Sequence, residues 1–438
     1  MAGIFKAYDI RGIYGDTLTD DIAHKIGRAF VQFLQCERVV VGRDMRAHSD
    51  SVFNALATGL MEQGADVIDI GLSSTPMCYF ANGKLGADAS MMITASHNPG
   101  EWNGFKLCRA AAVPISGATG IAEIEALVEQ DNFSTPSRQG QLAQYDINAE
   151  YAEHISKHAD VSSTLKIAVD YANAMGIVEH QAIGNLFEQV DLFSDLDGNF
   201  PNHEANPLNL ATLQDVQQAV VKHGCDFGIA YDGDADRVGF VDENGDIVSM
   251  DFITALIAKT MLQKKSGNVL YDLRSSRAVA ETIQEGGGTP IKSRVGHAFI
   301  KQQMREHQAI FAGELSGHYY FEENYCAESA ALAVILIANL ISQSKQTLSS
   351  LIAPIKRYSA SGEINSTVAD SAAVFERIRS QYAQAEFEEL DGLTVIFDGW
   401  WFNVRSSNTE PLIRLNLEAD DEATMARKTE EVLALIRA

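Results

Sequence analysis

Short runs of aliphatic and β-branched residues alternate along the chain with longer amphipathic stretches, and this alternation limits the choice of folds more than any other feature. Residues 50–63, for example, have helical spacing and lie between two such runs. The runs with the length and composition of buried strands are 38–42, 65–71, 90–94, 165–171, 226–231, 267–272 and 310–313. Strands that alternate with helices are typical of mostly parallel sheets packed between helices. The pattern restarts after residues 138–145 and 242–250, so we predict three α/β units.

A different order of elements is predicted near the C-terminus, after a loop at 359–364. A helix over 372–384 precedes a run of strands and a second helix, which is an α+β pattern. The strands and the second helix are predicted at 393–397, 400–405, 412–419 and 422–436. We therefore predict three α/β domains with mixed, mostly parallel sheets and a smaller α+β domain. Their expected ranges are 1–142, 143–248, 249–361 and 362–438.

The charge balance argues against polyanionic partners. Acidic residues outnumber basic ones by 59 to 34, which gives a formal net charge of −25. Such a charge repels nucleic acids and anionic membranes, so we expect neither as a partner.

The cysteines and the N-terminus are typical of a cytoplasmic protein. The five cysteines are scattered, with neither a CxxC pair nor zinc-ligand spacing, which indicates a reducing compartment. The opening residues, MAGIFKAYDIRG, lack the apolar core of a signal peptide. The longest apolar run, 330–338, is far shorter than the roughly 20 residues of a membrane span. We therefore expect a cytoplasmic protein.

The first motif, TASHNP at 94–99, ends a predicted strand in an Asn-Pro turn that is expected to present Ser96 outward. A serine hydroxyl can accept a phosphoryl group if a cation neutralises the developing charge. Taken alone, the segment is equally an ordinary turn capped by Ser and Asn. A Ser-His-Asp hydrolase is not indicated, because G-x-S-x-G is absent and His97 is expected to point away from its neighbour Ser96. Lys106, in the following NGFK, is a candidate acid/base or phosphate contact, or a solvated surface lysine.

The second motif, DGDADR at 232–237, predicts a magnesium site. Carboxylates at Asp232, Asp234 and Asp236 can converge on one hard cation if the segment is a loop, whereas a helix would turn the middle one away. The acidic spacing also matches an EF-hand, but Arg237 stands where that loop needs glycine and the flanks are strand-like. A solvated acidic turn is the plainer alternative.

Two further polar loops offer groups for a sugar phosphate. GELSGH at 313–318 supplies hydrogen-bonding side chains suited to sugar hydroxyls, although a polar loop is the simpler interpretation of that segment alone. RSSNTEP at 405–411, with Arg414 just beyond, combines a guanidinium, hydroxyls and an amide into an anion cradle. The sequence has neither a Walker A motif nor G-x-G-x-x-G, so ATP and dinucleotides find no standard site.

Taken together, the motifs resemble the α-D-phosphohexomutase family, in particular its bacterial phosphomannomutase/phosphoglucomutase branch. They occur in one order over the whole chain: KAYDIRG, TASHNP, DGDADR, RVGHAFIK, GELSGH and RSSNTEP. The resemblance implies three related α/β domains and a smaller C-terminal α+β domain around a central cleft. In chain order the domains would carry the phosphoserine loop, the metal loop, the sugar-recognition loop and the phosphate-binding loop.

The resemblance also implies roles for single residues. Ser96 would carry phosphate in the active enzyme and would hold Mg²⁺ together with Asp232, Asp234 and Asp236. The expected catalytic residues are Ser96, Lys106, Arg11, His318 and Arg237. The expected substrate-binding residues are Tyr8, His297, Glu314, Ser316, Arg405, Ser407, Asn408, Thr409 and Arg414.

The implied reaction moves a phosphoryl group between C6 and C1 of a hexose through a hexose 1,6-bisphosphate, which also serves as activator. GELSGH is similar to the GEMSGH of members that accept mannose and glucose phosphates, with Leu315 in place of Met. We therefore expect mannose phosphate as substrate, glucose phosphate as a second one, and a monomer or homodimer. The alternatives are a phosphoglucomutase, a phosphoglucosamine mutase, a magnesium-dependent sugar-phosphate phosphatase and a non-enzymatic regulatory homologue.

Overall fold

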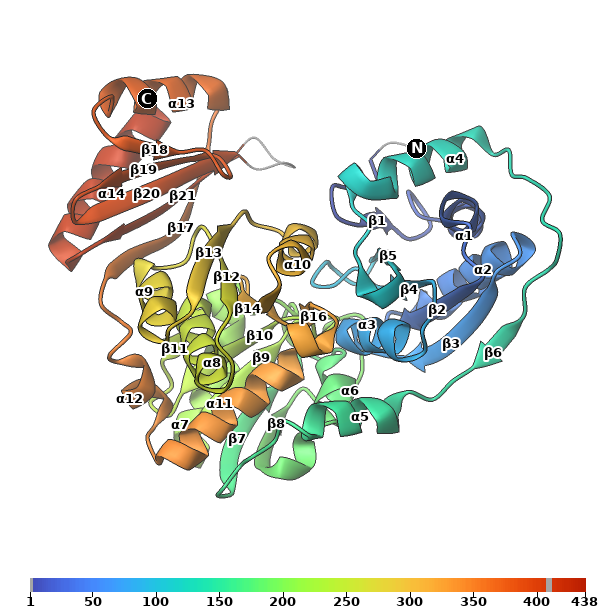
Figure 1. The fold of residues 1–438 in the computed structure, drawn as a ribbon, viewed down its shortest axis with the longest axis horizontal. Coiled ribbons are helices and arrows are strands. Elements are labelled where there is room, and N and C mark those ends of the chain that lie inside the picture. Colours follow the sequence, from blue (N-terminus) through green and yellow to red (C-terminus); the bar gives the residue numbers. More distant parts are fainter. Residues whose placement is uncertain (1–2, 407–411) are drawn as a thin grey trace.

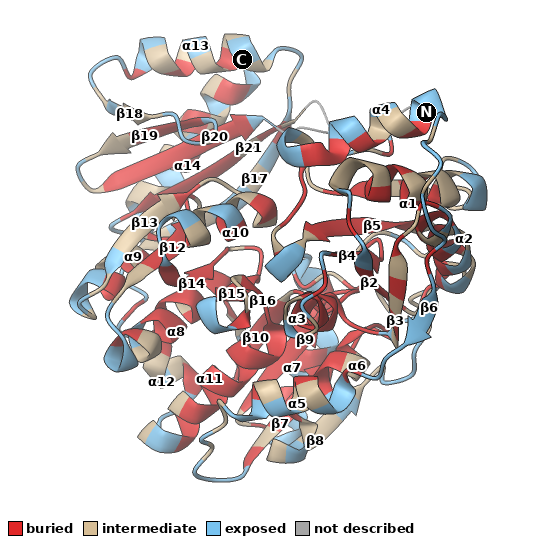
Figure 2. Ribbon diagram, turned by 45° about the vertical axis from the view of Figure 1, so that its right-hand side comes forward, coloured by how far each residue is buried: buried red, intermediate tan, exposed pale blue. Residues whose placement is uncertain are grey.

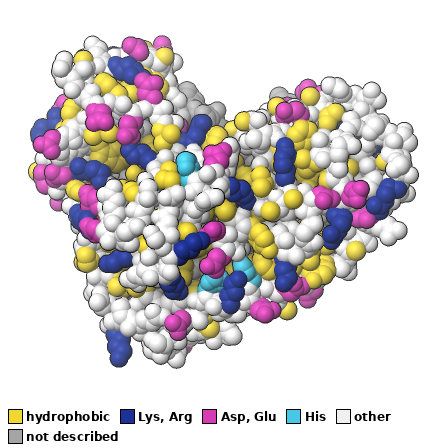
Figure 3. Space-filling model, viewed as in Figure 1, with side chains coloured by type: hydrophobic (Ala, Val, Ile, Leu, Met, Phe, Trp, Pro, Cys, Tyr) yellow, Lys and Arg dark blue, Asp and Glu magenta, His cyan; other side chains and the backbone are white. Residues whose placement is uncertain are grey.

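The computed structural model describes residues 3–406 and 412–438, whose strands form four sheets in chain order. Each of the first three sheets mixes parallel and antiparallel pairs, whereas the fourth is antiparallel. Figure 1 shows the N-terminal sheet and the C-terminal sheet on opposite sides of the middle of the chain. Figure 3 shows the surface hollowed between those two parts. The predicted fold class is confirmed.

The first sheet is covered by helices on both faces, because its central strands are apolar on both sides. Val39 and Val41 face α1 and α2, whereas Val40 and Met92 pack with α3. In spatial order the strands are β1 (Ile10–Ile13), β5 (Trp102–Arg109), β4 (Ala89–Ile93), β2 (Arg38–Arg43), β3 (Asp66–Leu72) and β6 (Leu142–Gln144). The helices are α1 (Asp20–Leu34), α2 (Ser49–Glu62), α3 (Thr75–Lys84) and α4 (Ala122–Gln130).

The second and third sheets lie side by side in the middle of the chain (Figure 1). The second has the order β11 (Ile247–Val248), β10 (Val238–Asp242), β9 (Phe227–Tyr231), β7 (Leu165–Asp170) and β8 (Phe187–Leu192). The third has the order β13 (Thr289–Ser293), β12 (Asn268–Asp272), β14 (Ala309–Gly313), β15 (Tyr319–Phe321) and β16 (Ala327–Glu328). Their helices are α5 (Asn148–Ser156), α6 (Gly176–His180), α7 (Gln214–His223), α8 (Met250–Lys264), α9 (Arg277–Glu285), α10 (His297–Glu306), α11 (Ala330–Ser344) and α12 (Leu348–Ile352).

The C-terminal sheet packs against two helices, α13 (Ser371–Gln381) and α14 (Glu422–Arg437). Its strand order is β17 (Ser359–Thr367), β21 (Leu412–Ala419), β20 (Trp400–Ser406), β19 (Leu393–Phe397) and β18 (Glu386–Glu388). All three segments expected as boundary loops contain edge-strand residues: 138–145 contains β6, 242–250 contains β11, and 359–364 lies within β17. The sequence hides them because an edge strand buries little surface and so lacks an apolar alternation.

One hydrophobic core joins the first three sheets, whereas the C-terminal sheet has a core of its own. The apolar run at 330–338 belongs to α11, which is buried along nearly its whole length at the centre of the shared core (Figure 2). Within the described residues, every helix is too short or too polar to cross a membrane.

Candidate active site

Ser96 lies in the turn after β4, at the bottom of the candidate site. Its φ is +51°, a left-handed conformation, and its side chain donates a hydrogen bond from Oγ to Asp232 Oδ2 at 3.0 Å. Ser96 is only 1% exposed, so the expectation that the turn presents it outward is wrong. The loop of Asp232 covers it closely: a Cβ added to Gly233 would lie 2.1 Å from the carbonyl oxygen of Ser96. Glycine is therefore required at that position.

His97 lies next to the Ser96 hydroxyl, contrary to the expectation that the two side chains diverge. The left-handed turn brings His97 Nδ1 to 3.2 Å from Ser96 Oγ. Burial, with the charges of Arg237 and Arg11, holds the pKa of His97 well below its usual value. The imidazole is therefore neutral and can exchange a hydrogen bond with the serine.

The carboxylates of Asp232, Asp234 and Asp236 converge in the loop between β9 and β10, within 4.8 Å of one another and fully buried. Burial and the two neighbouring charges raise the pKa of Asp232 well above its usual range. In the part of the chain that the structure describes, Asp234 Oδ1 and Asp236 Oδ1 are buried without a hydrogen-bond partner. Unpartnered carboxylate oxygens on a rigid loop are the donor set that a hard divalent cation needs. The three residues fit a magnesium ion.

Two cations flank this carboxylate cluster. Lys106 on β5 donates from Nζ to Asp234 Oδ2 at 2.6 Å and to Asp236 Oδ2. Burial acts against the ammonium, but the two carboxylates outweigh it and raise the pKa of Lys106, which stays protonated. Arg11 on β1 donates to the carbonyl oxygen of Ala95 at 2.9 Å and pairs with Asp9 at 2.7 Å. Both cations are thus positioned beside the Ser96 turn.

The loop after β14 brings Glu314, Ser316 and His318 to the same site. His318 Nδ1 lies 3.0 Å from Glu314 Oε2 and 2.9 Å from Ser316 Oγ, while its Nε2 lies 3.4 Å from Asp236 Oδ1. Burial lowers the pKa of His318, but Asp236 and Glu314 outweigh it and raise the pKa to about 9. Burial raises the pKa of Glu314, but His318 outweighs it and lowers the pKa to about 2. The pair is therefore an ion pair at neutral pH.

Arg237 links the metal loop to this pair. Its Nε lies 3.2 Å from His318 Nε2, a contact between two cations that is compensated by Asp232 and Asp236 at 3.8 and 3.9 Å. The backbone N–H of Arg237 also donates to Asp232 Oδ1 at 3.1 Å.

The aromatic rings of Tyr8 and His297 pack together beside His318. Their ring centroids are 6.0 Å apart in an edge-on arrangement, and the His297 ring is 6.3 Å from that of His318. His297 Nδ1 is buried 3.6 Å from Glu328 Oε1 and has no hydrogen-bond partner within residues 3–406 and 412–438. Burial raises the pKa of Tyr8, opposed by Arg294 and by Arg405 of the C-terminal domain. Tyr8 therefore lies where the first, third and fourth domains meet.

The C-terminal domain contributes Arg405 and Arg414, which face each other on β20 and β21. Both bind the carboxylate of Glu363 on β17, with N···O distances of 2.6 and 3.4 Å. The Nε atoms of both arginines are buried and have no hydrogen-bond partner among the described residues. Such free guanidinium donors can bind a phosphate. The predicted residues Ser407, Asn408 and Thr409 lie outside the described residues.

Sequence reasoning missed several residues that support the site. Arg274 lies 3.9 Å from Glu363 and binds Asp272 at 2.7 Å, so it adds a third guanidinium at the domain border. Thr75 donates from Oγ1 to Asp234 Oδ2 at 2.6 Å, and Arg46 binds the carbonyl oxygen of Ser96 at 2.8 Å. None of them lies in a motif, because each contacts a residue of the site that is distant in the sequence.

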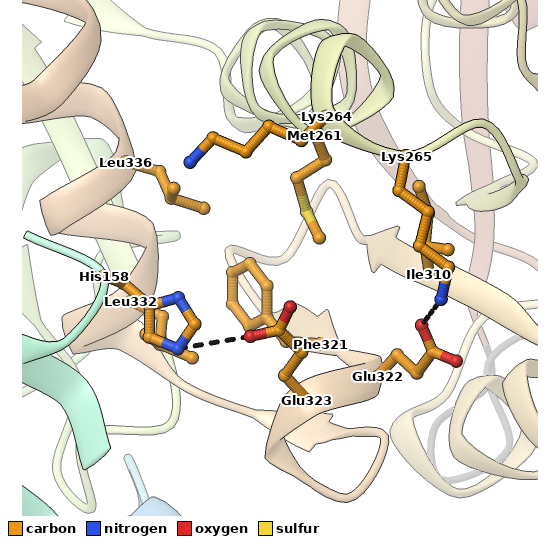
Figure 4. A pocket seen from close by; sticks show the side chains of 10 residues that line it. All are labelled: His158, Met261, Lys264, Lys265, Ile310, Phe321, Glu322, Glu323, Leu332 and Leu336. Atoms are coloured by element: carbon orange, nitrogen blue, oxygen red, sulfur yellow. Dashed lines mark hydrogen bonds and ion pairs between the residues drawn. The ribbon is translucent and has the colours of Figure 1, made fainter.

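The chain also has a cavity away from these residues, between α8, β14, β15 and α11 (Figure 4). Its floor is apolar and its volume is about 90 Å³. Two pairs of its side chains are in contact: His158 Nε2 lies 3.4 Å from Glu323 Oε2, and Lys265 Nζ lies 2.5 Å from Glu322 Oε2. It contains none of the predicted site residues.

Comparison with known proteins assigns the chain to a family. Models of the phosphoglucomutase/phosphomannomutase alpha/beta/alpha domains I, II and III match residues 2–135, 149–245 and 249–358, and the C-terminal domain model matches 363–435. A phosphomannomutase of Escherichia coli is 41% identical, and one of Methanocaldococcus jannaschii is 42% identical; the alignments cover 99% of this chain and 99% and 97% of theirs. A crystal structure of a phosphoglucomutase/phosphomannomutase family protein from Burkholderia thailandensis superposes with a TM-score of 0.91 at 32% identity, over 99% of this chain and 96% of that one.

The chain belongs to the phosphoglucomutase/phosphomannomutase family. It is accordingly an enzyme of the phosphohexomutase class, which transfers phosphoryl groups, and the predicted resemblance is confirmed.

Proposed function

We propose that the protein is a phosphomannomutase that interconverts mannose 6-phosphate and mannose 1-phosphate and accepts glucose phosphates as a second substrate. The observation that carries this proposal is the hydrogen bond of 3.0 Å between Ser96 Oγ and Asp232, within a buried cluster of three carboxylates. A serine that receives a phosphoryl group needs a cation beside it, and this cluster is built to hold one. The names of the bacterial and archaeal relatives support mannose phosphate as the substrate.

In the proposed reaction, phosphorylated Ser96 gives its phosphoryl group to a hydroxyl of a hexose monophosphate. The bond from phosphorus to Ser96 Oγ breaks, a bond from phosphorus to the sugar oxygen forms, the proton of that sugar hydroxyl passes through the acid/base residues of the site to Ser96 Oγ, and a hexose 1,6-bisphosphate results. The bisphosphate then turns over in the cleft and returns its other phosphoryl group to Ser96. Mg²⁺ held by Ser96, Asp232, Asp234 and Asp236 would neutralise charge on the transferring group.

The surrounding residues have distinct proposed roles. Arg11 and Lys106 stabilise the charge of the transferring group, because both are cations held beside the Ser96 turn. His318 and Lys106 carry protons in this arrangement, so either can protonate the leaving oxygen. Arg237 fixes Asp232, whose Oδ1 accepts its backbone N–H.

The remaining predicted residues bind the substrate. Glu314 and Ser316 accept hydrogen bonds from the sugar hydroxyls. Tyr8 and His297 line the sugar site. The proposed grip on the non-transferring phosphate consists of Arg405, Ser407, Asn408, Thr409 and Arg414. A site that binds phosphate through guanidinium groups and hydroxyls can bind the phosphate at either end of the sugar. We further propose a cytoplasmic monomer or homodimer.

A substrate panel tests the proposal. Purified protein with Mg²⁺ and a trace of glucose 1,6-bisphosphate receives mannose, glucose and glucosamine 1-phosphates, and both 6-phosphate and free phosphate are measured. We expect rapid turnover of mannose 1-phosphate that requires the bisphosphate, and slower or comparable turnover of glucose 1-phosphate. Turnover of glucosamine 1-phosphate alone would make the protein a phosphoglucosamine mutase. Free phosphate without isomerisation would make it a phosphatase, and no reaction at all would leave a regulatory homologue.

A further inference from the structure

Arg46 is a buried cation whose hydrogen bonds converge on the turn that carries Ser96. It follows β2, and its side chain is 0% exposed. Its Nε donates to Asp44 Oδ2 at 3.0 Å. Its two terminal nitrogens donate to four backbone carbonyl oxygens, those of Ser96 at 2.8 Å, Asn98 at 2.7 Å, Pro99 at 2.5 Å and Trp102 at 3.0 Å. A guanidinium has five N–H groups, so every donor of Arg46 is used.

The turn is held by hydrogen bonds of its own, such as that from the Ser96 N–H to Thr94 Oγ1 at 2.9 Å, and by Arg11, which donates to the carbonyl of Ala95 at 2.9 Å and to Asn98 Oδ1. Within it, Asn98 N–H donates to the carbonyl of Ala95, and Trp102 N–H to that of Pro99. Ser96 adopts a left-handed conformation, which is unfavourable for a residue other than glycine. A conformation of this kind persists where its surroundings over-determine it. The carbonyl of Ser96 is held by Arg46 on one side and covered by Gly233 on the other.

Neighbouring residues hold Arg46 itself in place. Asp44 accepts from its Nε and, through Oδ1, from Ser49 Oγ at 2.6 Å. The Phe200 ring of the second domain lies 5.2 Å from the guanidinium carbon. Burial lowers the pKa of Arg46, opposed by Asp44, and the planar five-donor fork is a shape that lysine cannot reproduce.

We propose that Arg46 is a positioning residue for phosphoryl transfer, which sets the left-handed turn and thereby aims Ser96 Oγ at Asp232. This inference rests on the proposed function, in which Ser96 carries the phosphoryl group. Arg46 touches only the backbone of the turn, so it acts through Ser96 and not on the substrate. Misplacement of a reacting oxygen by about 1 Å can cost about a hundredfold in rate.

The chain provides a matched control in Arg43, at the end of the same strand. Arg43 also pairs with two carboxylates, Asp50 at 2.6 Å and Asp69 at 2.7 Å, and lies over an aromatic ring, that of Phe53 at 4.3 Å. Among its interactions with the described residues, none reaches the Ser96 turn. R43K and R46K therefore both keep a positive charge and reduce the number of N–H donors. Only R46K removes hydrogen bonds to the Ser96 turn.

Hydrogen–deuterium exchange tests the positioning directly, without reference to any activity. In full-length R46K, peptides covering 94–102 should exchange at least about tenfold faster than in wild type. In R43K the same peptides should exchange at the wild-type rate. Peptides covering β2 and β4 should remain protected in both variants, which shows that the fold is intact. Unchanged exchange of 94–102 in folded R46K would overturn the proposal, whatever the enzyme catalyses.

Steady-state kinetics then separates positioning from general stability. For mannose 1-phosphate we expect kcat of R46K to fall about a hundredfold with KM nearly unchanged, and both constants of R43K to stay near those of wild type. Equal kcat values in R46K and R43K would contradict the proposal. An inactive wild type would instead refute the proposed function, and the exchange experiment would still decide on Arg46. Should R46K not fold, R46Q offers a second variant for the same measurements.

Discussion

The hydroxyl of Ser96 is the atom on which the proposed chemistry depends most. Ser96→Ala should reduce the isomerisation of mannose 1-phosphate by at least about a thousandfold, because alanine has no oxygen to carry the phosphoryl group. Since the hydroxyl is buried and donates to a carboxylate, its loss should also cost about 1–3 kcal/mol of unfolding free energy. Rate assays and urea unfolding on one preparation measure both. A folded S96A enzyme with a rate near that of wild type would exclude the phosphoserine mechanism.

Asp234 should determine how much magnesium the enzyme needs. Asp234→Asn removes a buried charge from the carboxylate cluster, so half-maximal activity should require at least about tenfold more Mg²⁺. The measurement is activity as a function of free Mg²⁺. Asp246→Asn, at an exposed aspartate on the neighbouring hairpin, is the control and should leave the curve in place. Identical curves for both variants would remove the DGDADR loop from the metal site.

The N-terminus of α3 holds the metal loop from the first domain. Thr75 donates from Oγ1 to Asp234 Oδ2 at 2.6 Å and from its backbone N–H to the carbonyl of Asp234 at 3.0 Å. Ser74, one residue earlier, caps the helix by accepting from Met77 N–H at 3.2 Å. A helix end in one domain thus orients a carboxylate in another.

This contact predicts a contrast between two variants of one residue. Thr75→Val keeps the shape but loses the hydroxyl, and should weaken Mg²⁺ binding about tenfold, as loss of an outer-shell partner does. Thr75→Ser keeps the hydroxyl and should bind Mg²⁺ as wild type does. Calorimetric titration of Mg²⁺ into each protein gives the affinities. Equal affinities for T75V and T75S would show that the hydroxyl does not orient Asp234.

Elements with a strong apolar pattern could be predicted from sequence, and those without one could not. The strand before Ser96 and the one before Asp232 are buried along their lengths, so their mostly apolar runs identified each of them. β6 is exposed at every residue and escaped notice. The loops that follow the strands carried recognisable motifs, but the left-handed turn at Ser96 depends on Arg46, 50 residues earlier in the chain. Contacts of that kind leave no local signal in the sequence.

The three α/β domains meet at one buried carboxylate, that of Glu179 on α6, which is 0% exposed. Ser74 of the first domain donates to Oε2 at 2.6 Å, and Tyr151 at the start of the second donates to Oε1 at 2.7 Å. The backbone N–H of Ala331, in the third, lies 3.4 Å from the same Oε1. Ser74, which binds Glu179, is adjacent to Thr75, which binds Asp234. These two residues therefore connect the junction to the DGDADR loop. A shift in the packing between the domains would therefore move Thr75 and with it the carboxylate of Asp234.

The junction predicts a pH-dependent stability. Burial raises the pKa of Glu179 from 4.5 to about 7, against the hydrogen bonds of Ser74 and Tyr151. Between these two values the folded protein binds a proton that the unfolded chain has lost, so the contribution of Glu179 to stability falls as pH rises, by up to about 1.4 kcal/mol per pH unit. Glu179→Gln cannot ionise, and its unfolding free energy should decline less from pH 5 to pH 7.5 than that of wild type. Urea unfolding at several pH values measures the slopes, with Glu153→Gln, at an exposed glutamate on α5, as the control that should keep the wild-type slope. Parallel slopes for E179Q and wild type would mean that Glu179 stays ionised in the folded protein throughout this range, so that the junction holds a charge rather than a proton.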